Sequence, residues 1–517
     1  MSCNGTGEKG GVVLQFILRR IGVSIFILWL ASVLMYVLTI NSGDPLQDLR
    51  QTNSSNREQL IAARVENMNL DEPWYTRYAI WLGGASKCLI LQCDLGTNRT
   101  GQSVNELVAD AAASSLRLVT LATVLAIVFG VTVGILAAIR QYSGFDYVVT
   151  FLAFLFFSLP VFWAAVLLKQ YGAIDFNNWI ADPGVSLVTT LLLALLFGMV
   201  FSVIAGGDTR RRVLTFAITA VVLFAVVTYF DAVGWWRRPA LGLGLIVLLS
   251  LAALAVLLML TVGLRNRRVI YCGLATIGVG IVSFFATRSL MEDPSWTLIL
   301  VLAAVAAVVG AVIGVAFGGY ERSTAIVISV GTALSFGFLV FLDQLLRNWG
   351  LYLEGNSRPI STIGSGSPLF SGNFYEGIWN WATQLILPTI VLTLISLAQY
   401  SRYTRSSMLE TTQQDYMRTA RSKGLSDRVV NTKHALRNAL IPITTIVAFD
   451  FASLIGGAVI TERVFGWSGM GALFQEGLNT VDPAPVMAFF LVTGAAAILM
   501  NMLADIAYAS LDPRIRR

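Results

Sequence analysis

The sequence predicts an all-α polytopic membrane protein with about twelve transmembrane helices. Apolar residues make up 56% of the 517 residues and charged residues only 13%, whereas an ordinary soluble domain has roughly 45–50% and 25%. The mean hydropathy is +0.71, and the apolar residues are gathered into long runs. These values exclude a soluble enzyme, a disordered protein and a disulfide-stapled scaffold.

Twelve stretches are long enough to cross a bilayer, because a helix spanning about 30 Å of hydrocarbon needs roughly 20 mostly apolar residues. They lie near residues 22–40, 118–139, 148–168, 185–206, 213–233, 240–264, 269–287, 297–318, 324–342, 381–399, 442–461 and 486–510. Arg19 and Arg20 precede the first stretch, as in a signal peptide, but the run is too long and no small-residue cleavage site follows. We therefore expect a retained first helix.

The positions of lysine and arginine predict that both termini are cytoplasmic. With the N-terminus inside, the seven cytoplasmic segments contain most of the 36 basic residues, as the positive-inside rule requires. The long segment 41–117 then lies outside and contains Cys88 and Cys93. Outside the cytoplasm this pair could close a small disulfide loop, or the two residues could be free thiols, and their spacing does not decide between these alternatives.

One cytoplasmic segment, the 400–441 loop, is long, polar and basic. Gly424 interrupts a helix-prone stretch and Pro442 opens the next span, which predicts a helix, a turn, a short helix and entry into the membrane. A solvated positive-inside loop would explain the charge. The length, and the alternation of Ala and Leu with basic residues, instead favour a docking surface for another chain.

Several motifs in this loop and elsewhere resemble peptide-type permeases of ABC importers. The loop contains Tyr416-Met-Arg-Thr-Ala-Arg-Ser-Lys-Gly-Leu-Ser426 and His434-Ala-Leu-Arg-Asn-Ala-Leu-Ile-Pro442. Other motifs of the family follow in the same order, namely Gly43-Asp44-Pro45, Ser158-Leu-Pro-Val-Phe-Trp163, Glu462-Arg-Val-Phe-Gly-Trp467 and Leu511-Asp-Pro-Arg-Ile-Arg516. The resemblance covers roughly residues 12–175 and 360–517.

The resemblance implies a non-catalytic permease subunit in the bacterial inner (plasma) membrane. With a second homologous permease it would form a pathway for di- or oligopeptides, delivered by an extracytoplasmic solute-binding protein. Two cytoplasmic ABC ATPase subunits would carry ATP and magnesium, while this chain would hold no cofactor of its own. Related permeases handle nickel, glutathione or haem, so the solute stays open.

The 400–441 loop is similar to the coupling segment of such permeases, whose short helix sits in a groove of an ATPase subunit. Arg418-Thr419 stands where the general motif has Glu-Ala, a departure that favours the peptide subgroup. The residues expected to couple to the ATPase are Tyr416, Arg418, Thr419, Ala420, Arg421, Lys423, Gly424, Leu425 and Ser426.

Coupling of this kind requires a stiff contact between the ATPase and the membrane helices. Gly424 would permit a tight turn and a close backbone approach, or it is an ordinary helix C-cap. The basic side chains of Arg421 and Lys423 could pair with carboxylates on an ATPase or with anionic lipid heads.

No catalytic, nucleotide or metal site is expected in the chain itself. The sequence lacks a G-x-x-x-x-G-K-[ST] phosphate loop, since Gly5-Thr-Gly-Glu-Lys-Gly10 has the wrong spacing, and it lacks nucleophile-elbow and zinc-protease motifs. One histidine and four cysteines leave almost nothing for a metal site. The basic residues punctuate apolar runs and do not form the solvated basic face that nucleic acid needs. The expected non-protein partner is membrane lipid.

Family permeases of this type have six spans, so six further spans are expected as an insertion. The predicted parts are a cytoplasmic N-terminus (1–21), a first core part (22–175), an inserted block (176–345) and a second core part (346–517). An even number of inserted spans keeps the 400–441 loop inside. Pro160 is expected to permit a bend in the third span.

Asp450 lies in the eleventh span, where a carboxylate is a functional candidate by default. It could line the pathway or be satisfied by a neighbouring helix. The main alternative for the whole chain is a twelve-span transporter driven by an ion gradient, which should show two matched halves, and no such repeat is visible. A second alternative is a non-transporting scaffold with the loop as a docking tail.

Overall fold

The protein is helical throughout the part that the computed structural model describes, residues 7–511 apart from 54, 262, 264–265 and 365–369. These described residues contain no strand, only an isolated bridge between Thr97 and Ser103. Ten of their helices are long and apolar enough to cross a membrane, or eleven when one bent pair counts as a single span. The predicted all-α polytopic class is confirmed.

The first part of the chain forms one span, an external segment and a second, longer span. The helices are α1 (Gly7–Ile40), α2 (Gln47–Arg50), α3 (Arg57–Asn67), α4 (Trp74–Ser86) and α5 (Val104–Ile139). The helix that contains the predicted second span, 118–139, is longer than that span. The helix begins at Val104, which is completely buried, because its outer end packs in a cluster with Tyr36, Trp81 and Met470.

The predicted third span, 148–168, is broken into two helices. α6 (Gly144–Ser158) and α7 (Val161–Lys169) are separated by Leu159 and Pro160, and the chain bends by 98° between α6 and the segment that α7 opens. A residue before proline is driven out of the helical region, and Leu159 is accordingly extended (ψ 123°). The bend expected at Pro160 is confirmed. α7 continues through a π-helical turn, 170–175, into α8 (Phe176–Ala181).

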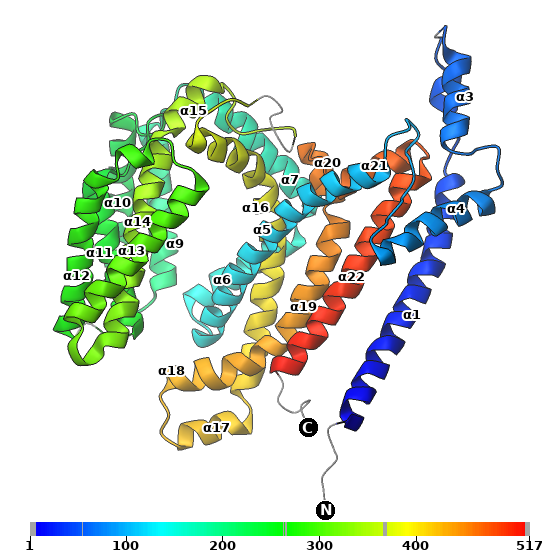
Figure 1. Ribbon diagram of the computed structural model, residues 1–517. Coiled ribbons are helices and arrows are strands. Elements are labelled where there is room, and N and C mark those ends of the chain that lie inside the picture. The colour runs from blue at the N-terminus through cyan, green and yellow to red at the C-terminus, as the bar shows by residue number, and fades with distance from the viewer. Residues whose placement is uncertain (1–6, 54, 262, 264–265, 365–369, 512–517) are drawn as a thin grey trace, which may run out of the picture.

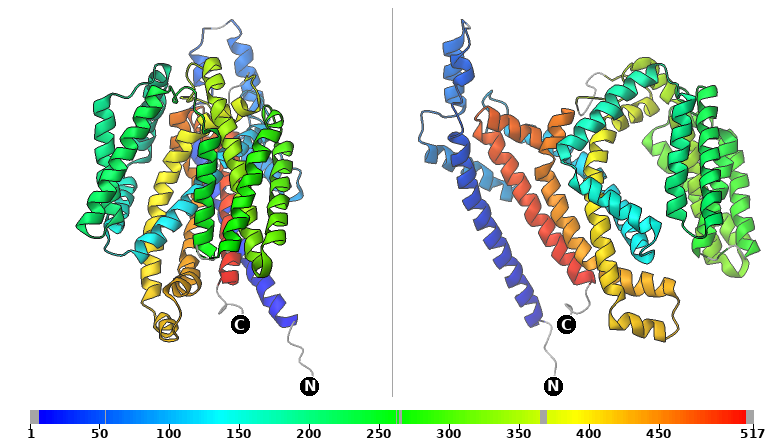
Figure 2. Two further views of the ribbon diagram at one scale, coloured as in Figure 1. Left: turned by 90° about the vertical axis from the view of Figure 1, so that its left-hand side faces the viewer. Right: turned by 180° about the vertical axis from the view of Figure 1, so that it is seen from behind.

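The predicted insertion forms a bundle with its own apolar core. Its helices are α9 (Leu187–Ala205), α10 (Thr209–Ala232), α11 (Gly242–Thr261), α12 (Arg267–Ala286), α13 (Trp296–Phe317) and α14 (Arg322–Arg347). Buried apolar residues of α11, α12, α13 and α14 form one cluster. Figures 1 and 2 show this green block standing beside the rest of the molecule. That it interrupts a six-span core stays a prediction.

The last part contains the long helix α16 and the segments that follow it. The helices are α15 (Trp349–Gly355), α16 (Phe374–Thr412), α17 (Asp415–Ser422), α18 (Asp427–Val429), α19 (Leu436–Gly457), α20 (Val459–Phe465), α21 (Met470–Asn479) and α22 (Pro483–Leu511). α19 covers most of the predicted span 442–461, but the side chains of 452–457 lie outside the described residues, so that span stays a prediction.

The inserted bundle contacts the rest of the molecule at both of its ends. At one end an aromatic cluster joins Trp236 to Trp349, Tyr352 and Trp379, where α15 crosses to α16 (Figure 1). At the other end Gly144 of α6 meets α9 so closely that an added Cβ atom would lie 2.3 Å from the carbonyl oxygen of Val203. α17 and α18 project at the end of the molecule where α1 begins and α22 ends (Figures 1 and 2).

Candidate functional site

The 400–441 loop is a folded unit built on the end of α16. α16 runs to Thr412, well past the predicted end of its span at residue 399, and α17 follows after two residues. A turn at Lys423–Ser426 leads to α18, and a π-helical segment (430–435) then continues into α19. The predicted order of helix, turn and short helix is confirmed, and entry of the following segment into the membrane stays a prediction.

The inner face of α17 is buried against the core. Met417 and Ala420, three residues apart and therefore on one face of the helix, pack with Met408 of α16, with Val430 and Ala435, and with the end of α5. Ala420, which was expected to contact an ATPase, is buried inside this chain and is not part of an outer surface. Its side chain packs α17 against the neighbouring helices.

The outer face of α17 and the turn after it is exposed and basic. Seven further residues expected to couple are exposed, namely Tyr416, Arg418, Thr419, Arg421, Lys423, Leu425 and Ser426. The hydroxyl of Tyr416 accepts a hydrogen bond from the Asn438 amide at 2.7 Å, which ties α17 to the base of α19. Arg421 and Asp427 form a long, exposed ion pair at 3.9 Å, and such pairs contribute little stability. The outer face is therefore free to meet another chain.

Gly424 ends α17 as a left-handed cap. Its φ is +76°, and its N–H donates to the carbonyl of Arg421 at 2.9 Å. An added Cβ atom would meet nothing within 4 Å, so no close backbone approach occurs within this chain. Glycine is required here for its backbone conformation.

A bidentate ion pair fixes α16 just before the loop. The Arg405 guanidinium donates to both carboxylate oxygens of Asp146 at 2.6 and 2.9 Å, and Asp146 is buried. The backbone N–H of Tyr142 also donates to Asp146, at 3.0 Å. Sequence reasoning missed this pair, although the Ser143 cap whose hydroxyl accepts the N–H of Asp146 is a local signal for the start of α6.

α5 and α16 pack with almost no space between their backbones. A Cβ atom added at Gly134 would lie 2.6 Å from the carbonyl oxygen of Ser401, and one at Gly130 would lie 2.8 Å from the Cβ of Tyr400. Small residues four apart allow such close contact in membranes, where packing replaces the hydrophobic driving force. α5, α16 and the loop therefore form a rigid assembly.

Asp450 of α19 faces α16. The hydroxyls of Ser396 and Tyr400 both donate to its Oδ2, at 2.8 and 2.6 Å. The alternative that a neighbouring helix satisfies Asp450 therefore has direct support, and a role in a pathway stays a prediction. Tyr400 also packs on Gly130, so Asp450 joins α19 to the contact between α5 and α16.

A second polar network, at the opposite end of the molecule, was also missed. Glu462 of α20 is completely buried and accepts hydrogen bonds from the Ser115 hydroxyl at 2.6 Å and the Ala472 N–H at 3.0 Å. Burial raises the pKa of Glu462. A Cβ atom added at Gly469 would lie 2.3 Å from Glu462 Oε1, which explains the glycine there. The sequence offered one sign of this network: Glu462 belongs to the motif 462–467, which resembles that of the peptide-type permeases.

The external segment is tied down at two points. Cys88 and Cys93 are joined by a disulfide, with their Cα atoms 4.0 Å apart. The backbone N–H of Arg99 donates to the buried carboxylate of Asp482 at 2.6 Å, linking this segment to the start of α22. Across the described part of the chain, no group of three or more His, Cys, Asp or Glu side chains is placed to hold a metal ion.

Comparison with known proteins identifies the family. Residues 327–517 match the family described as binding-protein-dependent transport system inner membrane component. The oligopeptide transport system permease protein OppB of Mycobacterium tuberculosis is 39% identical over 191 residues, which are 37% of this chain and 57% of that protein. This chain thus aligns with little more than half of OppB.

Two further relatives extend the match. A Brucella suis protein described as a peptide permease is 39% identical over 224 residues, covering 43% of this chain and 68% of that protein. The dipeptide transport system permease protein DppB of Alkalihalophilus pseudofirmus is 24% identical over 506 residues, covering 98% of this chain and 100% of that protein. This chain therefore belongs to the family of binding-protein-dependent transport system inner membrane components.

Proposed function

We propose that this chain is a permease subunit of an ATP-driven importer and forms, with a second homologous permease, a pathway for di- or oligopeptides. The observation that carries the proposal is the geometry of α17. Its buried face is fixed to α5, α16 and α19, while its basic outer face is exposed. A short helix held in this way can transmit a displacement from another chain into the membrane helices. Family membership favours this function over the ion-gradient-driven alternative.

The partners follow from the same proposal. Two ATPase subunits, carrying ATP and magnesium, bind at the outer face of α17 on the cytoplasmic side of a bacterial inner membrane, where both termini also lie. A solute-binding protein docks at the opposite end. A cavity of about 420 Å³ at that end is lined by Arg463, Gln475 and Glu476 among others, and the opposite charges of the exposed Arg463 and Glu476 suit the two termini of a peptide.

The solute class rests on the relatives. OppB is named for oligopeptide transport and DppB for dipeptide transport, and these names supply the first candidates for this chain. Asp450 remains the candidate pathway residue for a peptide ammonium group.

The proposal is tested by purification and transport together. The full chain, tagged and isolated from the membranes of its own cell, should co-purify with two ATPases and a second permease. In proteoliposomes the complex should accumulate labelled di- or oligopeptide only when ATP and the binding protein are present. A preparation that lacks ATPases, or uptake that follows an ion gradient without ATP, would overturn it.

Gly424 provides the sharper test of coupling. Valine disfavours a positive φ, whereas asparagine tolerates it. Gly424→Val should therefore uncouple ATP hydrolysis from uptake, and Gly424→Asn should retain coupling if its side chain fits the partner's groove. Gly263, also at φ +76° with open space around it, lies outside the loop, so Gly263→Val is the matched control and should transport normally. Normal uptake by Gly424→Val would remove this turn from the mechanism.

A further inference from the structure

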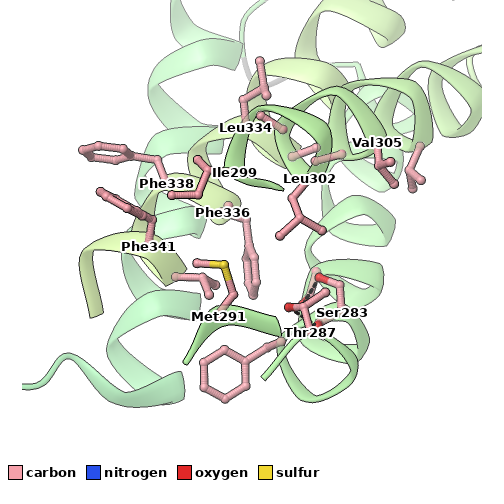
Figure 3. Close-up of a pocket in the computed structure, with 18 of the residues that line it drawn as sticks. Ser283, Thr287, Met291, Ile299, Leu302, Val305, Leu334, Phe336, Phe338 and Phe341 are labelled. Atoms are coloured by element: carbon pink, nitrogen blue, oxygen red, sulfur yellow. Dashed lines mark hydrogen bonds between the residues drawn. The ribbon is translucent and has the colours of Figure 1, made fainter. Parts of the chain in front are cut away.

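The inserted bundle contains a cavity that the proposed function does not use. It has a volume of about 390 Å³ and lies between α12, α13 and α14, within the range of roughly 300–1,000 Å³ typical of ligand pockets. Figure 3 shows Met291, Leu302 and Phe336 extending into the same space from three different segments. The cavity therefore belongs to the bundle alone.

The walls of the cavity offer almost no hydrogen bonds to a ligand. Its three hydroxyl groups donate to carbonyls of their own helix: Thr276 to Cys272 at 2.8 Å, Ser283 to Gly280 at 2.7 Å and Thr287 to Ser283 at 2.9 Å. The other side chains that line it are apolar. Because a buried water or polar ligand needs two to four polar partners, the chemistry selects hydrocarbon.

The dimensions of the cavity match one leaflet of a bilayer. On α12 and its C-cap residue the lining runs from Thr276 to Thr287, which is about 16 Å at 1.5 Å per residue. One half of a hydrocarbon core about 30 Å thick has nearly the same depth. This lining lies in the second half of α12, away from Arg267 and towards the loop that leads to α13.

The cavity is open along its side, and a basic residue follows its last lining residue on α12 in the chain. Three of the lining side chains are well exposed, those of Val305 (53%), Leu334 (41%) and Phe338 (62%). They form a rim past which the acyl chain of a lipid in the bilayer can enter. Trp296, 61% exposed, stands at the outer end, as interfacial tryptophans do. Arg288 follows Thr287 directly, is exposed and forms no ion pair with any residue that the structure describes.

We propose that this cavity holds one acyl chain of a membrane phospholipid whose phosphate lies at Arg288. The lipid belongs to the leaflet opposite the 400–441 loop. The apolar walls and the leaflet-deep lining accept the chain, and the guanidinium provides the charge-assisted contact for the phosphate. This binding does not depend on the proposed transport function.

The test places the full chain in nanodiscs of phosphatidylethanolamine and phosphatidylglycerol with a trace of phospholipid that carries a photoreactive diazirine in mid-chain. After illumination, the adducts should map to cavity-lining peptides of α12, α13 and α14. Native mass spectrometry of the detergent-released chain should show one retained phospholipid. Adducts spread evenly over all lipid-facing helices, with no retained phospholipid, would overturn the proposal.

A matched pair of variants separates the cavity from the general lipid surface. Gly337 lines the cavity and Gly278 of α12 does not, yet both are exposed glycines at which an added Cβ meets nothing within 4 Å. Gly337→Leu should fill the space and lower cavity adducts about tenfold, whereas Gly278→Leu should leave them unchanged. Equal labelling of two folded variants would contradict the proposal. If Gly337→Leu does not fold, the adduct map of the unmodified chain decides alone.

Discussion

The molecule has two contrasting regions: the core, by which we mean α5, α6, α16 and α19, and the inserted bundle, α9 to α14. They use the same close packing of helices but differ in their polar contacts. In both, glycines four apart bring two helices together, Gly130 and Gly134 of α5 against α16, and Gly310 and Gly314 of α13 against α14. In the core, side chains of different helices also bond to one another, as Asp146 does to Arg405 and Asp450 to Tyr400.

In the inserted bundle the polar side chains mostly satisfy their own segment. Asp343 bonds to Arg347 one turn away in α14 and accepts the N–H groups of Leu241 and Gly242 at the start of α11. The hydroxyls of α12 donate to carbonyls of the same helix. The difference indicates that hydrogen bonds between side chains join the helices of the core so that they move as a unit, whereas the helices of the bundle are held mainly by apolar packing.

The largest contrast is expected between the two arginines. Arg405→Ala leaves Asp146 buried without its partner and should lower the free energy of unfolding by about 3–5 kcal/mol. Arg347→Ala should cost below about 1 kcal/mol, because Arg347 is half exposed and Asp343 keeps two backbone donors. Denaturant titration of the full chain in mixed micelles measures both.

A double variant separates the loss of the ion pair from the loss of packing by the aliphatic part of the Arg405 side chain. With Asp146→Leu and Arg405→Leu together, no uncompensated charge remains, so most of the stability should return. Similar losses for Arg405→Ala and Arg347→Ala would mean that the core is not held more strongly by its polar contacts than the bundle.

A smaller contrast is expected between two hydroxyl groups. Tyr400→Phe removes one hydrogen bond to Asp450, leaves that from Ser396, and should cost about 1 kcal/mol. Ser329 of α14 is completely buried and its hydroxyl has no hydrogen-bond partner among the residues that the structure describes, so Ser329→Ala should be neutral or slightly stabilising. The same titrations check both, and a clear loss for Ser329→Ala would show that the bundle also depends on polar contacts.

The smallest expected effect is a dependence of stability on pH. Burial raises the pKa of Glu462, so its contribution to folding is fully present below the unfolded value, near 4.3. That contribution is lost as the pH rises from there through the raised folded value. Thermal unfolding midpoints should therefore fall across this window, and Glu462→Gln should flatten the slope. Glu476→Gln, at an exposed position in the same region, should leave it unchanged.

The sequence predicted the positions of the helices better than their ends. Length and hydropathy are local properties of a run, so ten of the twelve runs coincide with a helix and one with a bent pair, while the run 442–461 crosses from α19 into α20. The extensions of α5 back to Val104 and of α16 on to Thr412 were missed because packing outside the hydrocarbon holds them. Val104 and Met408 are both buried there, each by segments distant in sequence.

The candidate site was predictable to a similar depth. The motif at residues 416–426 predicted a short helix, which is α17, and the turn at Gly424. The spacing of Met417 and Ala420 also indicates a buried face of that helix, and this indication was overlooked. Pairs distant in the chain carry no such sign. Arg405 and Asp146 are 259 residues apart and Ser115 and Glu462 are 347 apart, so only the three-dimensional path of the chain brings them together.

The contact between Gly144 and Val203 has a consequence for the size of the moving unit. α6 leaves no room for a side chain against α9, so any tilt of α6 that preserves the contact must displace α9 too. Because α9 packs in the bundle, the whole bundle would then be displaced laterally in the surrounding lipid. If the proposed coupling at α17 moves α6, the area of bilayer that is rearranged would include that around the bundle as well as that around the core.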